Sequence, residues 1–280
     1  MIEAELRPRG PYSLRLTTQL ATDACRRARD GAVTAVLPEG RAVAWQRSDG
    51  AVCIRSRSEA AVEQMRFCLA LDDDHSEFLR RFRDDPLLGR ATHELRGLRP
   101  LRVPTVAQAL LRAVAGQLIQ WKEARNVERR VIRAATEREP DGLHRPPTAA
   151  DLAGFSPAQL RRHGLGTRRG SALVRLCRSL DLERLRDAPS AAVATRLLRE
   201  PGLGPWSVGL VALEGLGRYD LGLARDLGLV KLLSAVEGRW VEADETDALL
   251  APYGEWAGLA SVYLLKAAAR GLVPAPRLAA

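Results

Sequence analysis

Residues 197–233 read LLREPGLGPWSVGLVALEGLGRYDLGLARDLGLVKLL and decide the fold of this chain. Apolar spacing predicts a helix that ends at Glu200, and the Pro-Gly-Leu-Gly sequence at 201–204 predicts a compact turn. Pro205 suits the first position of a second helix, where its missing N–H costs nothing, and this helix is expected to end near Gly217. The stretch therefore predicts two helices joined by a tight hairpin.

The hairpin turn has the properties of an anion site. Gly202 and Gly204 lack the Cβ atoms that keep another backbone at a distance. The free N–H groups of the turn and of the following helix point outward, so a phosphodiester can bind there without a charged side chain. Ser207 adds a hydroxyl donor in the first helical turn. An ordinary αα-hairpin, with glycines that allow tight packing, explains the turn alone equally well.

Length, apolar content and charge are typical of a globular protein with a polyanionic partner. The 280 residues suffice for two or three packed units, and 46% of them are apolar. The formal net charge is +9, which favours binding to a polyanion. Nearly all basic residues are arginines, a bias that a GC-rich genome produces by itself. The charge alone therefore carries little weight.

The cysteines, the histidines and the first residues exclude further classes of protein. The four cysteines are widely spaced and form no C-x-x-C pair, which argues against a zinc or iron–sulfur site and for buried free thiols in a reducing compartment. The four histidines are scattered, and we expect them to be solvated. The start, MIEAELRPRG, has no signal-peptide core, and no stretch approaches the roughly 20 apolar residues of a membrane span. We expect a cytoplasmic protein.

The first 57 residues are expected to form an antiparallel sheet with one or two helices. Alternating apolar and polar residues predict a strand at 12–17, and three further β-runs between residues 31 and 58 are separated by Glu-Gly and Asp-Gly hairpin turns. Residues 21–29 fit a helix. The segment Ser58–Leu71 has helical apolar spacing.

The remainder is predicted to be almost entirely helical. The acidic run 72–74 is expected to be a solvated cap, and an extended connection at 101–104 leads to a helix that begins at Thr105. Near its end, Gly-Gln-Leu at 116–118 either packs as a polar cap or presents Gln and Leu to a ligand. A loop at 164–169 carries two arginines and is either a plain turn or a phosphate contact. Further helices are predicted at 121–139, 148–153, 156–163, 168–179 and 256–270.

Three motifs in this order resemble the helix-hairpin-helix superfamily of DNA glycosylases. They are Gly-Gln-Leu at 116–118, Pro-Gly-Leu-Gly-Pro-Trp-Ser at 201–207 and Asp226 before a helix. The β-rich first unit, Leu-Asp-Asp-Asp at 71–74 and Leu-Arg-Val-Pro at 101–104 are similar to bacterial 3-methyladenine DNA glycosylases of the AlkA type. The resemblance covers most of the chain, and it implies a bacterial protein bound to the DNA of the nucleoid.

The resemblance implies a role for particular residues. Asp226 falls on the catalytic aspartate, although an N-cap role for the following helix explains it as well and both roles are compatible. The implied DNA contacts are Gly202, Gly204, Ser207, Gln117 and the wedge Leu118. The implied base pocket consists of Trp206, Trp256 and Leu210. The resemblance also implies a structural Na⁺ or K⁺ at the backbone carbonyls of Leu198, Glu200 and Leu203, whereas no side-chain metal ligand or other cofactor is expected.

The chain departs from the family pattern at several positions. Arg225 stands where the family member has a second aspartate, Leu210 replaces an aromatic, and Trp121 is unusual after the Gly-Gln-Leu segment; these departures affect substrate range. Lyase members of the superfamily have a lysine at the position that Trp206 occupies here. With lysines only at 122, 231 and 266, a Schiff base is not expected, which predicts a monofunctional enzyme.

We therefore expect an α+β protein: an N-terminal antiparallel sheet and helix domain at 1–80, a helical subdomain with the catalytic Asp at 81–104 plus 218–280, and a helical subdomain with the DNA-binding hairpin at 105–217. We expect the protein to be a monomer and a monofunctional glycosylase. It is expected to excise alkylated purines of the 3-methyladenine type from double-stranded DNA, by base flipping and aspartate-assisted hydrolysis of the N-glycosidic bond. Alternatives are a glycosylase for deaminated or oxidised bases and a non-catalytic DNA-damage binding protein.

Overall fold

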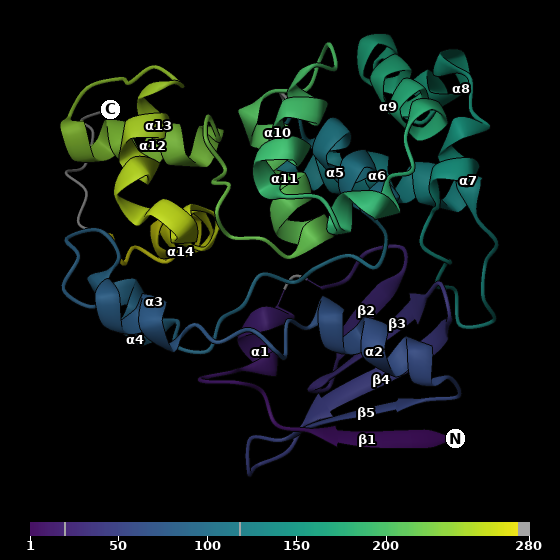
Figure 1. Ribbon diagram of the computed structural model, residues 1–280, viewed down its shortest axis with the longest axis horizontal. Helices are drawn as coiled ribbons and strands as arrows, with labels where there is room; N and C mark the ends of the chain where they lie inside the picture. The colour runs from purple at the N-terminus through teal and green to yellow at the C-terminus, as the bar shows by residue number, and fades with distance from the viewer. Residues whose placement is uncertain (20, 118, 274–280) are drawn as a thin grey trace.

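The computed structural model describes residues 1–19, 21–117 and 119–273. A five-stranded antiparallel sheet occupies the N-terminal part, with the strand order β1-β5-β4-β3-β2 (Figure 1). Its strands are β1 (Ile2–Leu6), β2 (Arg26–Arg29), β3 (Ala32–Leu37), β4 (Gly40–Gln46) and β5 (Val52–Ser56). The two predicted hairpin turns join β3 to β4 and β4 to β5, and the predicted antiparallel sheet is confirmed.

Two predictions in this part are wrong. Residues 12–17 form no strand but contain the short helix α1 (Leu14–Thr17), whose first turn is capped by the hydroxyl of Ser13 and tied to β4 by a Leu14 N–H bond to the Gln46 side chain. Residues 21–29 form no helix. The carboxylate of Asp23 instead accepts two backbone N–H bonds in a turn, after which β2 pairs with β3. In both places contacts distant in sequence override local spacing.

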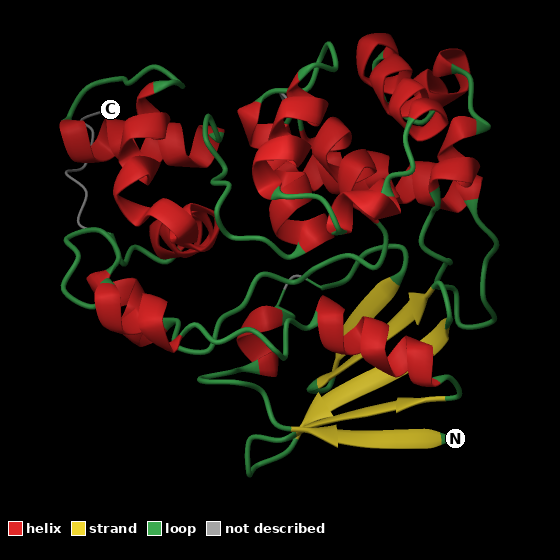
Figure 2. Ribbon diagram, viewed as in Figure 1, coloured by secondary structure: helices red, strands yellow, loops and turns green. Residues whose placement is uncertain are grey.

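The helix α2 (Glu59–Cys68) crosses one face of the sheet, as Figures 1 and 2 show. It confirms the helix predicted at 58–71. Ser58 caps it, and Val62 and Met65 on its inner side pack with Val33 and Ile54 of the sheet into a hydrophobic core of their own. Burial of these branched and long apolar side chains stabilises the N-terminal unit.

Helices joined by loops follow from Glu59 to Ala269, which confirms the predicted mixed α+β architecture (Figure 2). The α-helices are α3 (Ser76–Arg81), α4 (Gly89–Glu94), α5 (Val106–Gly116), α6 (Trp121–Ala135), α7 (Ala149–Ala153), α8 (Pro157–Arg162), α9 (Thr167–Ser179), α10 (Ser190–Leu198), α11 (Pro205–Leu210), α12 (Leu227–Glu237), α13 (Glu245–Leu250) and α14 (Ala257–Ala269). Short 3₁₀ helices, η1 (Glu183–Arg186) and η3 (Ala251–Trp256), and a π-helix, η2 (Val211–Leu216), complete them.

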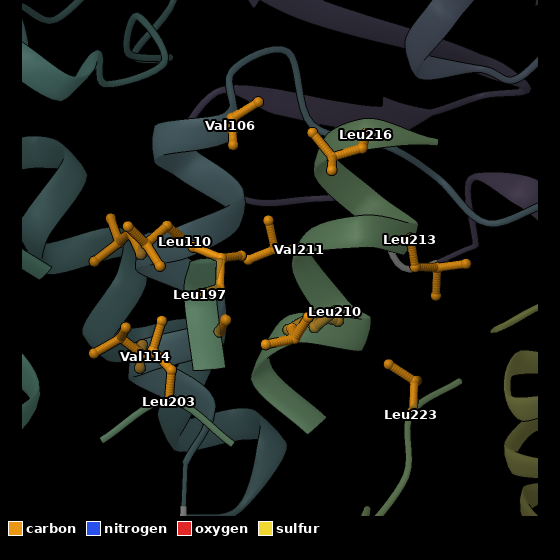
Figure 3. Close-up of a cluster of buried hydrophobic side chains, with 14 of the residues drawn as sticks. Val106, Leu110, Val114, Leu197, Leu203, Leu210, Val211, Leu213, Leu216 and Leu223 are labelled. Carbon is orange, nitrogen blue, oxygen red and sulfur yellow. The ribbon is translucent and has the colours of Figure 1, made fainter. Parts of the chain in front are cut away.

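A second hydrophobic core runs through the helices. Figure 3 shows its centre, where Leu110 and Val114 of α5 lie beside Leu197 of α10, Leu203 of the hairpin turn and Val211 of η2. Because α11 continues directly into η2, this packing fixes the second helix of the hairpin against α5. The hairpin is thus part of the main core.

A buried ionic network joins the sheet to this core. The guanidinium of Arg112, on α5, pairs with Asp23 before β2 at 3.0 Å, with Glu128 of α6 at 2.9 Å, and with Glu214 of η2. Burial alone raises the pKa of Glu128, but the guanidinium groups of Arg112 and Arg125 outweigh it and lower that pKa to about 2. The four elements are therefore held together by charges that all have partners. The division at residues 80, 104 and 217 stays a prediction.

Candidate active site

The predicted hairpin is present. Helix α10 ends at Leu198, and α11 begins at Pro205 with Gly204 as its N-cap residue. Gly202 has φ +97°, a left-handed conformation that favours glycine. An added Cβ at Gly202 or at Gly204 would meet no atom within 4 Å, so both glycines face open space. The turn therefore presents its backbone, rather than side chains, to whatever binds there.

The end of α5 is tied to this hairpin by one side chain. The amide of Gln117 donates to the Gly202 carbonyl at 2.7 Å and to the Ser207 hydroxyl at 2.9 Å. Ser207 is only 2% exposed, so its hydroxyl is engaged inside the protein. Arg169, at the start of α9, donates to the Gln117 carbonyl at 2.8 Å. The structure thus brings the predicted residues Gln117, Gly202 and Ser207 together, and the predicted wedge Leu118 lies outside the described residues.

Asp226 lies at the N-terminus of α12 and has two hydrogen-bond donors. One carboxylate oxygen accepts the Gly228 N–H at 2.7 Å, which confirms the N-cap role. The other accepts the Trp206 indole Nε1–H, also at 2.7 Å. Trp206 belongs to the first turn of α11, so the hairpin and the carboxylate are directly connected. Ordered by two charge-assisted bonds, this carboxylate is suited to stabilise a positive charge that develops beside it.

The ring of Trp206 lies against the last turn of α5. A Cβ added to Gly116 would come within 2.6 Å of this ring, so glycine is required for the close approach. Leu210, one turn further along α11, is 8% exposed and belongs to the helical core in Figure 3. Its assignment to a base pocket stays a prediction.

Trp256 takes part in an aromatic cluster. Its ring is stacked on Tyr219 at a centroid distance of 6.3 Å and lies 5.9 Å from Phe78 and 6.2 Å from His75. His75 is 2% exposed, and burial lowers its pKa to about 3, assisted by the charges of Arg99 and Arg102. The histidines were expected to be solvated; for His75 and for His144, which is 6% exposed, this expectation is wrong.

Sequence reasoning missed the polar partners of this cluster. Asp73, in the acidic run expected to be a solvated cap, is largely buried and pairs with Arg102 and with the Tyr219 hydroxyl. Asp72 and Asp74 are exposed as predicted; Asp72 pairs with Arg66, and the carboxylate of Asp74 accepts the Ser76 N–H at 2.8 Å at the start of α3. One signal in the sequence could have revealed the burial of Asp73. Arg102 is a cation in the otherwise apolar connection, and a buried cation needs a carboxylate partner.

The remaining predictions concern the burial of the thiols, metal-binding side chains and membrane-spanning helices. Cys25, Cys53, Cys68 and Cys177 are buried free thiols, as predicted. Across residues 1–19, 21–117 and 119–273, no three His, Cys, Asp or Glu side chains are grouped so that they could hold a metal ion. Within the same ranges, no helix has the length and apolar character needed to cross a membrane.

The fold defines a class of protein. It is shared with the 3-methyladenine DNA glycosylase of Archaeoglobus fulgidus, with a TM-score of 0.82, 20% identity, and coverage of 95% of this chain and 98% of that one. It is also shared with an 8-oxoguanine glycosylase/lyase of Clostridium acetobutylicum, solved with double-stranded DNA, with a TM-score of 0.79, 17% identity and coverage of 98% and 99%. The chain has the fold of the helix-hairpin-helix DNA glycosylases.

Sequence comparison gives named relatives. The chain is 28% identical over 222 residues to a probable bifunctional transcriptional activator/DNA repair enzyme AlkA of Mycobacterium tuberculosis, covering 75% of this chain and 45% of the relative. It is 23% identical over 218 residues to a DNA-3-methyladenine glycosylase of Bacillus subtilis, covering 74% and 72%. The chain thus spans about half the length of the first relative. No family model matches it. The predicted resemblance to AlkA-type glycosylases is confirmed.

Proposed function

We propose that the chain is a monomeric, monofunctional DNA glycosylase that removes alkylated purines of the 3-methyladenine type from double-stranded DNA in base-excision repair. The observation that carries the proposal is the carboxylate of Asp226, held at 2.7 Å by the indole of Trp206 at the start of the hairpin helix. The names of the M. tuberculosis and B. subtilis relatives support it. An N-cap role accounts for the bond from the Gly228 N–H but not for the second bond, from the Trp206 indole, and this second bond favours a catalytic carboxylate over a protein that only binds damaged DNA.

In the proposed reaction, the target nucleotide leaves the duplex, because the C1′–N bond cannot be reached inside it. The open backbone of Gly202 and Gly204 holds a phosphate, and Leu118 fills the gap that the flipped nucleotide leaves. Trp206 and Trp256 stack on the base. As the bond breaks, positive charge develops on the deoxyribose, and the Asp226 carboxylate stabilises it and orients the attacking water. Residues 105–217 thus bind DNA, while 81–104 plus 218–280 supply the carboxylate.

A structural Na⁺ or K⁺ at the hairpin belongs to the same proposal. The donor set fits a hard monovalent cation, because it consists of backbone carbonyl oxygens: those of Leu198, Glu200 and Leu203. The Glu200 carbonyl accepts the Leu203 N–H at 3.0 Å and keeps a second lone pair for a cation. Bound there, a cation would fix the turn without taking part in bond cleavage.

We propose that the enzyme does not cut the DNA strand. In lyases of this superfamily a lysine amine forms a Schiff base from the position that Trp206 occupies here, and an indole cannot do so. Product DNA is expected to stay intact until it is heated in alkali, and borohydride is expected to trap no covalent complex. A trapped adduct would contradict this part of the proposal.

The likeness to an 8-oxoguanine glycosylase/lyase supports a second candidate, removal of an oxidised or deaminated base. Alkylation at N3 or N7 gives the purine a formal positive charge, which weakens the glycosidic bond and favours stacking on tryptophan by roughly 0.5–2 kcal/mol. We therefore expect 3-methyladenine and 7-methylguanine to be released well ahead of hypoxanthine or 8-oxoguanine. Fastest release of a neutral base would favour the second candidate, and Leu210 and Arg225 would then be examined first.

The deciding experiment is mass-spectrometric detection of free bases released from methylated DNA by the wild-type chain and by Asp226→Asn. The substitution keeps the size of the side chain but removes the charge and one of the two oxygens that accept the Gly228 N–H and the Trp206 indole N–H. Base release is expected to fall by about a hundredfold or more, with duplex binding retained. No release by the wild-type chain, together with tight binding to damaged duplexes, would favour the non-catalytic binding protein. Equal release by both chains would exclude Asp226.

A further inference from the structure

The turn that precedes Asp226 has a conformation that its sequence disfavours. The Asp226 N–H donates to the Leu223 carbonyl at 3.1 Å and closes a four-residue turn. Its third residue, Arg225, has φ +68°. Turns with a positive φ at this position ordinarily have glycine or asparagine there, because a side chain is strained in the left-handed region. Something in the surrounding structure must therefore hold Arg225 in place.

Two buried hydroxyl groups, on two different helices, bind the backbone of the turn. Thr246 of α13 accepts the Arg225 N–H at 2.7 Å, and Ser261 of α14 accepts the Leu223 N–H at 3.0 Å. Both residues are 0% exposed. Each hydroxyl donates its own hydrogen to a carbonyl of its own segment, Thr246 to Ala243 at 2.6 Å and Ser261 to Ala257 at 2.7 Å. The lone pairs that remain face the turn, so neither hydroxyl can rotate away without losing a buried bond.

These bonds determine where the carboxylate of Asp226 lies. Arg225 is its neighbour in the chain, and a change in the backbone of Arg225 rotates the peptide that leads to Asp226. The carboxylate keeps both the Trp206 indole and the Gly228 N–H at 2.7 Å only in the observed orientation. The side chain of Arg225 contributes little, because its guanidinium is about half exposed and meets Asp247 at 3.4 Å.

We propose that Thr246 and Ser261 are positioning residues that fix the left-handed turn at Arg225 and thereby aim the Asp226 carboxylate. The proposal rests on the proposed function, in which Asp226 stabilises the developing charge. Neither hydroxyl touches DNA, so both act on the rate of bond cleavage and not on duplex affinity. A misplaced catalytic group costs rate even where binding is intact.

The test compares Thr246→Val, which removes the hydroxyl at equal size, with Thr246→Ser, which keeps it. Thr92→Val is the matched control, because Thr92 is also buried and its hydroxyl also donates to a carbonyl three residues earlier, of Gly89 at 2.8 Å. Single-turnover base release is measured with the duplex dissociation constant. Separately, the indole N–H resonance of Trp206, assigned with Trp206→Phe, is recorded in the DNA-free protein.

Thr246→Val is expected to lower the single-turnover rate by about tenfold to a hundredfold, to leave the dissociation constant within about twofold, and to move the Trp206 resonance. Thr246→Ser and Thr92→Val should match the wild type in all three. An unmoved resonance with a wild-type rate would overturn the proposal. If Thr246→Val does not fold, Ser261→Ala gives the same readouts at the other hydroxyl. If the wild-type chain releases no base, the proposed function fails, and the Trp206 resonance still decides whether the hydroxyls aim Asp226.

Discussion

Trp206 combines two properties in one side chain. Its ring lies so close to Gly116, at the end of α5, that an added Cβ there would meet it at 2.6 Å, while its indole N–H reaches the carboxylate of Asp226 at 2.7 Å. A phenylalanine could pack but could not donate. The hydrogen bond to the carboxylate can therefore be tested separately from the packing of an aromatic ring.

Trp206→Phe is expected to slow single-turnover base release by roughly tenfold to a hundredfold. A hydrogen bond to a charged group contributes about 1.5–3 kcal/mol, and about 1.4 kcal/mol is a factor of ten in rate. The rate is measured on a duplex with a single 7-methylguanine. Trp45→Phe, on β4 and remote from Asp226, is the control. An unchanged rate for Trp206→Phe would show that the bond does not orient the carboxylate.

His75 is buried and neutral in the folded protein, since burial lowers its pKa from 6.5 to about 3. In the unfolded chain the imidazole takes up a proton near pH 6.5. Between these values the unfolded state binds more protons than the folded state, so stability falls as the pH falls. The stabilisation by neutral His75 is complete above pH 6.5 and is lost progressively toward pH 3.

His75→Phe is expected to remove this pH dependence. For the wild-type chain, the free energy of unfolding should decrease by about 1.4 kcal/mol per pH unit below pH 6.5 as a consequence of this residue. Denaturant unfolding between pH 6.5 and 5 measures the slope, and the acidic groups contribute mainly below that window. His93→Phe, at an exposed histidine, should keep the wild-type slope. An equal slope in both variants would contradict a buried neutral His75.

At the scale of elements, the hairpin between α10 and α11 separates the requirements of folding from those of binding. Leu203 belongs to the helical core (Figure 3), whereas an added Cβ at Gly202 or Gly204 would face open space. Packing therefore accounts for Leu203 and not for the glycines. Gly204 has φ −112°, a value open to any residue, so folding alone does not explain why it lacks a side chain.

Gly204→Ala is expected to leave the free energy of unfolding within about 0.5 kcal/mol and to raise the duplex dissociation constant about tenfold, because the added methyl group keeps a phosphate from the backbone. Denaturant unfolding and fluorescence anisotropy measure the two quantities. Gly154→Ala, at the exposed end of α7, is the control. If Gly204→Ala binds DNA like the wild type, the turn is an ordinary αα-hairpin.

At the scale of the whole molecule, the Arg112 network joins parts that are far apart in sequence. Its members come from the turn before β2, from α5, from α6 and from η2, and Arg112 and Glu128 are 5% and 1% exposed. A buried ion pair stabilises little by comparison with apolar residues, but removal of Arg112 takes the partner from Glu214 and leaves Glu128 with Arg125 and Asp23 with Arg26, so that buried negative charge exceeds positive charge. Arg112 is therefore the cation that links all three carboxylates, one before β2, one on α6 and one on η2.

Arg112→Met is expected to destabilise the protein by about 3–5 kcal/mol at pH 7. The loss should be smaller at about pH 4, because without the Arg112 guanidinium the pKa of Glu128 is lowered less and its buried carboxylate takes up a proton more readily. Arg55→Met is the control, because its pair with Glu3 is half exposed and should contribute less than about 1 kcal/mol. Denaturant unfolding at both pH values checks the prediction, and equal losses for the two variants would contradict it.

Much of the fold could be predicted from local signals. The hairpin over 201–205, the helices after residue 105 and the β3–β4–β5 meander follow from glycine, proline and apolar spacing, and each is present. The wrong assignments at 12–17 and 21–29 have a common cause. There, short segments with ambiguous spacing are decided by distant partners, such as Gln46 for α1 and β3 for β2.

The sequence by itself determined the hairpin, the N-cap at Asp226 and the buried free thiols, because each depends on residues within a few positions or on composition. Only the tertiary structure decided that the Trp206 indole donates to Asp226, that Gln117 holds the turn, and that hydroxyls of α13 and α14 hold the residue before the carboxylate. These contacts join segments separated by 20 to 85 residues. No local spacing specifies them, since they exist only once the two hydrophobic cores have brought the helices together.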